Sequence, residues 1–530
     1  MARPIPRQVP AQVAKPQAPE PALVARVQAM RAEAEKLLAV QAEQYWRNWV
    51  YGDRIDIAAT YQGHEALFEK RSVDLVARLA SEIADPTGKR ALEYFRLYLV
   101  GEAVGRAVAP FSDAAANIEV DATITVPGDG ERPYRELNRL LASEVNYQLR
   151  GEISDAAVPV LVKLAVPLES RELLARDALA RMGFPSYAAF GAALRQVDLS
   201  ALARLAGLLL DDTEPLYRTA MDREARGVLG VGLSALRRAD IPRLDRATAA
   251  DAYFPAGKMV PALAATLAGL GIDLARQPNI RIDDAPLPGK NPRAVCFPVA
   301  VPGDIRLSVK PMGGAADWQA LFHEAGHAEH YAHAQTPFFE FRELGDATTT
   351  EAYAFVLEDL VAEPEWLVEK TGMPAAEAAA FARGAATRKL YLLRRYAGKL
   401  LFEIAWHAGA RDPRALYRKE MARAYLFPLS DADADRFLVD HDDFFYSADY
   451  FRAWFLAAQI EASLVRRFGP RWWDRKEAGE ALIALWREGN RLSVDEVARA
   501  AGDSGLSTEP LLAQLRERLR GAVAPAPRAR

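Results

Sequence analysis

The chain has 530 residues, of which half are hydrophobic and 26% are charged, a composition typical of a folded globular protein rather than a disordered one. Its 67 basic and 71 acidic residues give a net charge of -4, which argues against nucleic acid as a partner, and the single cysteine, Cys296, excludes an intrachain disulfide and a zinc site built from cysteines. No apolar run reaches the roughly 18 residues that cross a bilayer, and the N-terminus lacks the apolar core of a signal peptide. We therefore expect a cytoplasmic protein with no membrane partner, or an exported protein whose signal is missing.

The first predicted elements form a helical N-terminal lobe over 23–290, after a Pro- and Ala-rich arm over 1–22 that is expected to be disordered. Ala is abundant, and Gly and Pro fall mainly between periodic stretches, which favours helices. Ile118 to Val126 is rich in β-branched residues and precedes a Pro-Gly-Asp-Gly turn, which indicates a strand. One set of apolar residues follows the spacing of a single helical face: Leu137, Leu140, Leu141, Val145 and Leu149. Four aromatic residues are expected to pack a helix: Tyr45, Trp46, Trp49 and Tyr51.

The second half of the chain begins with a predicted β-hairpin. Two apolar, β-rich runs between Arg293 and Lys310 flank the turn sequence Pro302-Gly303-Asp304. Gly313 and Gly314 then interrupt the pattern, and a helix is expected from about Ala316. The fold class that follows is mainly α, with one short antiparallel hairpin beside this helix.

This helix carries the motif H-E-x-x-H, formed by His323, Glu324 and His327. Residues at i and i+4 stand on one helical face, about 5–6 Å apart, so two imidazoles can reach one zinc ion. Glu324 lies next to the first histidine and can take a proton from a water molecule at the metal. The motif predicts one zinc per chain in a lobe over 291–522, which a flexible tail over 523–530 follows.

Two candidates exist for the third zinc ligand. His333 has the histidine spacing of the metzincins, but His330 stands where that family has a glycine that lets the chain turn, so the helix is expected to continue. Glu351 lies 24 residues after His327, at the start of an apolar helical run. A buried carboxylate needs a charge partner, and a zinc ion is one.

The sequence gives the other polar candidates less specific roles. Glu358 shares the helical face of Glu351 and either accepts a hydrogen bond from a ligand histidine or is a solvated charge. His330 is expected to be a packed helix histidine, and we assign no role to His64 and His407.

The segment HEAGHAEH and the distant Glu351 resemble the thimet oligopeptidase and oligopeptidase F family of zinc peptidases, which are of the gluzincin type. The 24-residue gap to Glu351 is also similar to that in angiotensin-converting enzyme, and Glu358 matches a family glutamate. The resemblance covers about 290–365 and again 440–460. It implies two helical lobes around a deep cleft.

The second stretch of the resemblance contains His441, Tyr446 and Tyr450, whose spacing matches the substrate-binding segment of the oligopeptidases. In that family a further tyrosine is the main donor to the oxyanion, and here Ala453 occupies its position. The resemblance implies that His441, Tyr446 or Tyr450 stabilises the oxyanion instead. The alternative is that this segment is a helix whose aromatic residues only pack in the core. Arg452 has no clear role.

These observations predict a zinc-dependent peptidase that hydrolyses short peptides with Glu324 as general base, and that is expected to be a monomer. The edge of the hairpin around Leu307 to Lys310 is expected to pair with the peptide backbone. The alternatives are an inactive zinc-binding relative and a zinc hydrolase of a substrate other than peptides.

Overall fold

Helices make up most of the chain, as the composition predicts, in the computed structural model, which describes residues 19–520. The helices of the first half are α1 (Pro21–Tyr51), α2 (Ile57–Thr60), α3 (Lys70–Glu82), α4 (Pro86–Asp121), α5 (Leu137–Ser143), α6 (Tyr147–Asp155), α7 (Val158–Arg181), α8 (Tyr187–Arg195), α9 (Leu199–Leu229), α10 (Ile241–Arg246) and α11 (Met259–Gly269). Those of the second half are α12 (Ala315–His333), α13 (Phe339–Glu343), α14 (Thr348–Glu358), α15 (Pro364–Thr371), α16 (Ala375–His407), α17 (Pro413–Tyr425), α18 (Asp431–Ala434), α19 (Phe437–Asp440), α20 (Tyr446–Phe468), α21 (Lys476–Trp486), α22 (Val494–Ala500) and α23 (Glu509–Arg520). None of the helices in the described range is long and apolar enough to cross a membrane.

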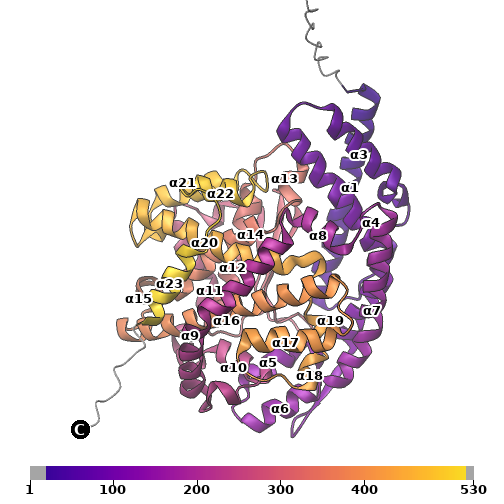
Figure 1. Cartoon of the computed structure of the whole chain (residues 1–530). Helices are drawn as coiled ribbons and strands as arrows, with labels where there is room; N and C mark the ends of the chain where they lie inside the picture. The colour runs from indigo at the N-terminus through magenta and orange to yellow at the C-terminus, as the bar shows by residue number, and fades with distance from the viewer. Residues whose placement is uncertain (1–18, 521–530) are drawn as a thin grey trace, which may run out of the picture.

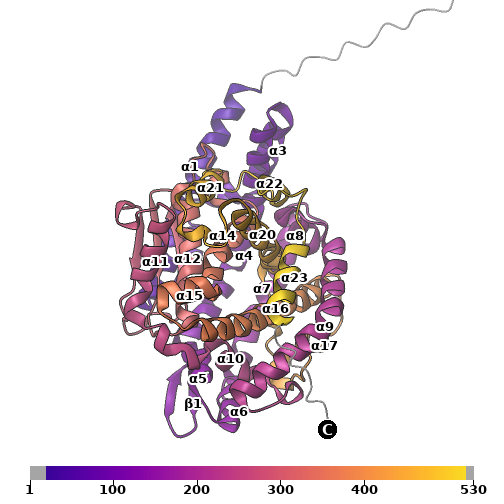
Figure 2. The same ribbon diagram turned by 90° about the vertical axis from the view of Figure 1, so that its left-hand side faces the viewer.

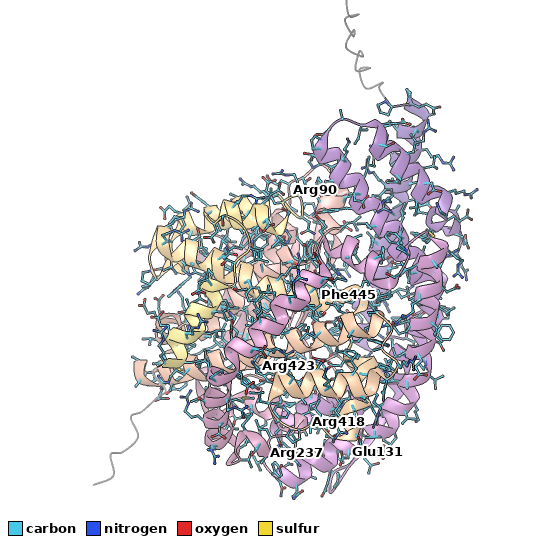
Figure 3. All side chains as sticks on the ribbon, viewed as in Figure 1. Arg90, Glu131, Arg237, Arg418, Arg423 and Phe445 are labelled. Carbon is cyan, nitrogen blue, oxygen red and sulfur yellow. The ribbon has the colours of Figure 1, made fainter. Side chains whose placement is uncertain are left out.

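The N-terminal helices α1, α3, α4 and α7 lie together on one side of the molecule, and α15, α21 and α23 lie on the other (Figure 1). After a quarter turn, α1 and α3 project at one end, while β1 (Thr123–Val126), α5 and α6 lie at the opposite end (Figure 2). Charged side chains such as Arg418 and Arg423 on α17 lie at the surface (Figure 3).

Three predictions for the first half need correction. Helix α1 begins at Pro21, so the predicted arm extends too far, and its first 18 residues and the predicted tail lie outside the described residues. The predicted strand is correct only from Thr123, because α4 continues to Asp121. The predicted single helical face over 137–149 is divided between α5 and α6, since Asn146 caps a new helix by accepting a hydrogen bond from the backbone N–H of Leu149.

A three-stranded sheet stands beside the helix that carries the motif. The predicted hairpin is present as β4 (Val295–Ala300) and β5 (Asp304–Ser308), which pair antiparallel. A third strand, β3 (Ile280–Asp283), pairs parallel with β5, so the order is β3-β5-β4 and the sheet spans the predicted lobe boundary at residue 290. The prediction that the edge around Leu307 to Lys310 is free to pair is therefore wrong, because β5 is the central strand, and β3 and β4 are the two edge strands.

Helix α14 lies at the centre of the hydrophobic core. Every residue of α14 from Thr348 to Leu357 is buried, and the helix packs between α12 and α20. Large side chains fill the surroundings, among them Trp318, Trp366 and Trp486, each at most 1% exposed. A helix buried on all sides can carry a polar residue only where that residue has a partner, so Glu351 on α14 requires one.

Candidate metal centre

The start of α12 is fixed by a turn that only glycine adopts easily. Gly313 and Gly314 have φ angles of 84° and 95°, in the left-handed region. The carboxylate of Asp317 accepts hydrogen bonds from the backbone N–H groups of Met312 and Gly313, at 2.7 and 2.9 Å. The helix thus begins at Ala315, within one residue of the predicted start, and sets the direction in which its histidines point.

His323, His327 and Glu351 meet at one point, as the sequence predicts. The Nε2 atoms of the two histidines lie 3.4 and 3.7 Å from Oε2 of Glu351, and all three ligand atoms are within 4.8 Å of one another. Two tetrahedral zinc ligands at about 2.0–2.1 Å from the metal are separated by about 3.4 Å. The spacing therefore matches that of a three-residue zinc site.

Hydrogen bonds on the far side of each ring direct the Nε2 atoms toward Glu351. His323 donates from Nδ1 to Oε2 of Glu358 at 2.8 Å, and Nδ1 of His327 lies 2.8 Å from Oγ1 of Thr350. When each Nδ1 carries the proton, each Nε2 has a free lone pair for a metal. Glu358 thus has the orienting role that the sequence left open, and Thr350 has a similar role that sequence reasoning did not assign.

Glu351 has the properties of a ligand rather than of a helix-start glutamate. It is 3% exposed, and its Oε2 atom has no hydrogen-bond donor. Burial alone would raise the pKa of Glu351, but His327, His323 and the hydroxyl of Tyr446 outweigh it and lower the pKa to about 2. A buried, ionised oxygen without a donor, facing two imidazole nitrogens, fits a divalent cation.

Glu324 lies beside this group without joining it. Its Oε2 atom accepts a hydrogen bond of 2.7 Å from the backbone N–H of Cys296 on β4. The hairpin thereby fixes the position of the glutamate next to the ligand histidine. A carboxylate that is close to a metal but is not a ligand can act as a base.

A glycine within the motif brings the two ligand helices together. A Cβ atom on Gly326 would lie 2.5 Å from Cα of Ala354 and 2.7 Å from the carbonyl oxygen of Tyr353, so no other residue fits. The backbone contact between α12 and α14 sets the distance from the two histidines to Glu351.

Tyr446, the first residue of α20, has a role that differs from the predicted one. Its hydroxyl donates a hydrogen bond of 2.6 Å to Oε1 of Glu351, so it positions a ligand instead of facing a substrate. Phe444 and Phe445 have φ angles of 51° and 59°, which are costly for residues other than glycine. Arg195 stabilises this turn by donating to the carbonyl of Phe444 at 3.0 Å. Phe445 is fully buried.

Arg452, which has no clear role in the sequence, fixes the start of α14. It donates two hydrogen bonds to Asp346, at 3.0 and 2.9 Å, and one to Asp449 at 2.9 Å. Asp346 in turn accepts from the backbone N–H of Thr348 at 2.9 Å, one turn before Glu351. The start of the helix that carries Glu351 is therefore held by a buried network from α20.

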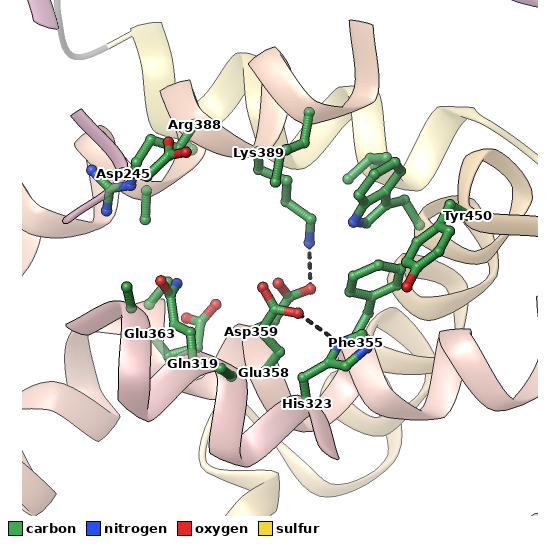
Figure 4. Close-up of a pocket in the computed structure, with 18 of the residues that line it drawn as sticks. Asp245, Gln319, His323, Phe355, Glu358, Asp359, Glu363, Arg388, Lys389 and Tyr450 are labelled. Atoms are coloured by element: carbon green, nitrogen blue, oxygen red, sulfur yellow. Dashed lines mark hydrogen bonds and ion pairs between the residues drawn. The ribbon is translucent and has the colours of Figure 1, made fainter. Parts of the chain in front are cut away.

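Tyr450 faces the cavity beside the metal group. This cavity of about 360 Å³ is also lined by His323, Glu324, Glu358 and Arg293. Figure 4 shows Tyr450 and His323 among the residues that line this cavity, with a dashed line for the ion pair between Lys389 and Asp359. Arg293, which the sequence did not single out, has no ion pair among the described residues.

Ala453 is fully buried on α20, so a tyrosine at this position would have no space. The main phenol of the oligopeptidases therefore has no counterpart there, and two other tyrosines, Tyr396 and Tyr450, line the cavity with Glu324.

The structure does not bring His441 to the metal group. Its Nε2 atom lies 3.3 Å from Oε1 of Glu172, and its ring packs on Trp406 and near His407. Glu172, His407 and His441 form a second buried group of potential ligand atoms within 4.8 Å. Arg176 lies 2.9 Å from Nδ1 of His407 and can only donate, so the neutral ring carries its proton on Nε2. Because Nε2 of His407 carries this proton, it has no free lone pair for a metal.

The other histidines lie away from the metal group. Nδ1 of His333 contacts the carbonyl oxygen of Glu329 at 2.9 Å and its ring packs near Trp486, so the metzincin alternative has no support here. His330 is a packed histidine, fully buried between Tyr331 and Tyr353, and burial lowers its pKa to about 3.

The chain matches none of the protein-family models against which it was compared, and a search of curated proteins returns no similar chain. The function must therefore be argued from this site.

Proposed function

We propose that this protein is a zinc-dependent peptidase, with His323, His327 and Glu351 as metal ligands and Glu324 as general base. The observation that carries the proposal is the buried, ionised Oε2 atom of Glu351, which has no donor and faces two oriented Nε2 atoms. Glu324 adds the element that a purely structural zinc site does not need. The resemblance of the motif to the oligopeptidases supports the same conclusion.

Zinc bound there would supply Lewis acidity toward a carbonyl oxygen and would lower the pKa of a water molecule. The carboxylate of Glu324 takes the proton of that water and transfers it to the leaving amine. The N–H of Cys296 holds this carboxylate in place. Tyr450 can donate its hydroxyl proton as a hydrogen bond to the developing oxyanion from within the cavity.

A peptide is the substrate that fits the sheet next to the site. Of the two edge strands, β4 is the one whose Cys296 N–H reaches Glu324, beside the proposed metal ligands. An extended chain that added to this edge would place its backbone beside the metal group. The cavity of about 360 Å³ leaves room for a few side chains and favours short peptides.

The deciding experiment compares Glu324→Gln with the wild-type chain on a peptide mixture read by mass spectrometry. We expect wild-type cleavage that a chelator abolishes and zinc restores. Glu324→Gln should retain zinc and lose activity by about 10²–10⁴, the contribution of a general base. Glu517→Gln, at an exposed position on α23, is the matched control and should cleave normally. A metal-loaded wild-type chain that cleaves no peptide would contradict the proposal.

A further inference from the structure

A second cavity, of about 560 Å³, has no lining residue in common with the first. Its walls come from α1, α4 and α7, and two segments connect it to the metal centre. Phe297 and Pro298 line it and follow Cys296 on β4, while Asp443 and Phe444 line it and precede Tyr446. A peptide along β4 would therefore reach this cavity within a few residues of the scissile bond, at about 3.3 Å per residue.

The cavity is strongly acidic. Its carboxylates come from four helices or loops: Glu102, Asp113, Glu172, Glu343 and Asp443. Arg171 is the one cationic side chain among the described residues that line it, and it pairs with Asp443 at 2.6 Å. Arg171 also lies 3.9 Å from Oε1 of Glu172, so three of the five carboxylates, those of Glu102, Asp113 and Glu343, share no ion pair with a cation of the lining.

Two of these carboxylates are buried without full hydrogen bonding. Glu172 is 6% and Asp113 is 8% exposed, and each has one oxygen with no donor. The other oxygen of Asp113 accepts from the backbone N–H of Ala58 at 3.0 Å. A buried carboxylate oxygen without a donor is costly, unless a ligand with N–H groups completes it.

Tyr45 on α1 adds an aromatic face to the same cavity. The sequence suggested a packing role, but Tyr45 is 45% exposed, whereas its neighbour Trp46 is 7% exposed. Burial of its hydroxyl and the nearby charges of Glu102 and Asp113 raise the pKa of Tyr45 to about 12. Carboxylates around an aromatic ring are the surroundings in which proteins bind ammonium and guanidinium groups.

We propose that this cavity binds a cationic group of the substrate peptide, a lysine or arginine side chain or the free amino terminus, while the scissile bond lies at the metal centre. The inference rests on the proposed peptidase function and adds the class of peptide that the site prefers. Glu172 and Asp113 provide the acceptors, and Tyr45 covers the cation.

The first test moves a single arginine through each position of a neutral nonapeptide. Citrulline, which has the same shape without the charge, replaces arginine in a parallel series, and each peptide is made with a free and with an acetylated amino terminus. We expect kcat/KM to rise about tenfold or more at one position, or for the free amine. Ratios near one at every position and terminus would overturn the inference and leave the peptidase proposal intact.

The second test measures binding without catalysis. Zinc-loaded Glu324→Gln is titrated calorimetrically with the arginine and the citrulline form of each peptide. Tighter binding of the arginine or free-amine form supports the subsite even if the wild-type chain cleaves nothing. Equal affinities in every pair would overturn it.

A matched pair of variants locates the effect. Glu172→Gln should bring the arginine-to-citrulline ratio close to one, while Glu169→Gln, exposed on the same helix and outside the cavity, should keep the wild-type ratio. Asp113→Asn provides an independent variant should Glu172→Gln fail to fold. An unchanged ratio in the folded cavity variant would contradict the assignment.

Discussion

Two groups of two histidines and one glutamate lie in the interior of this molecule, and their hydrogen bonds differ. In the first, His323 and His327 have acceptors at Nδ1, so each Nε2 atom is free to bind a cation with Glu351. In the second, Arg176 donates to Nδ1 of His407 and brings a positive charge to the group. Residue identity and proximity do not make a metal site. The hydrogen bonds on the far side of each ring decide it.

The largest expected effect is on zinc content, which should differ between variants of the two groups. Glu351→Gln should lose zinc from a site that otherwise holds one per chain, because an amide cannot supply the negative charge. Glu172→Gln should retain the full amount. Elemental analysis after dialysis measures both. Undiminished zinc in Glu351→Gln, or two zinc ions in the wild-type chain, would break the distinction.

A second comparison concerns the oxyanion. Tyr450→Phe should lower kcat by about 10²–10³ with little change in KM, since one donor to the transition state is lost. His441→Gln should change kcat far less, because His441 contacts Glu172 and not the metal group. Steady-state kinetics on one cleaved peptide provides the test. An equal loss in both variants would return His441 to the active site.

The orienting bond of Glu358 should have a smaller effect. Glu358→Gln keeps an acceptor but removes the charge behind His323, so zinc affinity should fall by about 10–100-fold. Competition with a chromogenic chelator measures this affinity. Glu517→Gln is again the exposed control, and equal affinities in the two variants would show that Glu358 does not support the site.

The smallest effect depends on pH. Burial lowers the pKa of His407 to about 2, well below the roughly 6.5 of an unfolded histidine. As pH falls below about 6.5, His407 binds a proton in the unfolded chain but not in the folded chain. The free energy of unfolding therefore decreases in that range. The slope for one group approaches about 1.4 kcal/mol per pH unit.

His407→Gln should therefore flatten the decline of the metal-free protein's unfolding free energy between pH 6 and 5. Urea unfolding at each pH measures it. In the first group, Glu351 and Glu358 outweigh burial and raise the pKa of His323, so this histidine contributes with the opposite sign. An unchanged slope in the variant would show that His407 is not the group that titrates.

Local patterns in the sequence predict the helices, the hairpin and the metal motif, because each depends on residues close in the chain. The i, i+4 spacing places His323 and His327, and the apolar run after Glu351 indicates its burial. The strand β3 was not predicted, since a four-residue strand becomes apparent only when it pairs with β5.

The direction of the segment before α20 could not be predicted from spacing. Phe444 and Phe445 adopt left-handed backbone angles that their residue types disfavour, and contacts distant in sequence, such as the bond from Arg195, hold them there. This turn directs Tyr446 to Glu351 while His441 lies with Glu172. Spacing that matches a family therefore identifies these residues, but it does not predict which residues they contact.

The contact at Gly326 has a consequence for the relation between folding and the proposed zinc site. The helices that carry the ligands meet backbone to backbone, and the buried bonds from Arg452 and Tyr446 hold Glu351 without any ion. Small zinc domains fold only as the metal binds, because it provides their core. Here a large apolar core provides the stability, so under the proposed function the chain would complete its folding first and receive zinc afterwards.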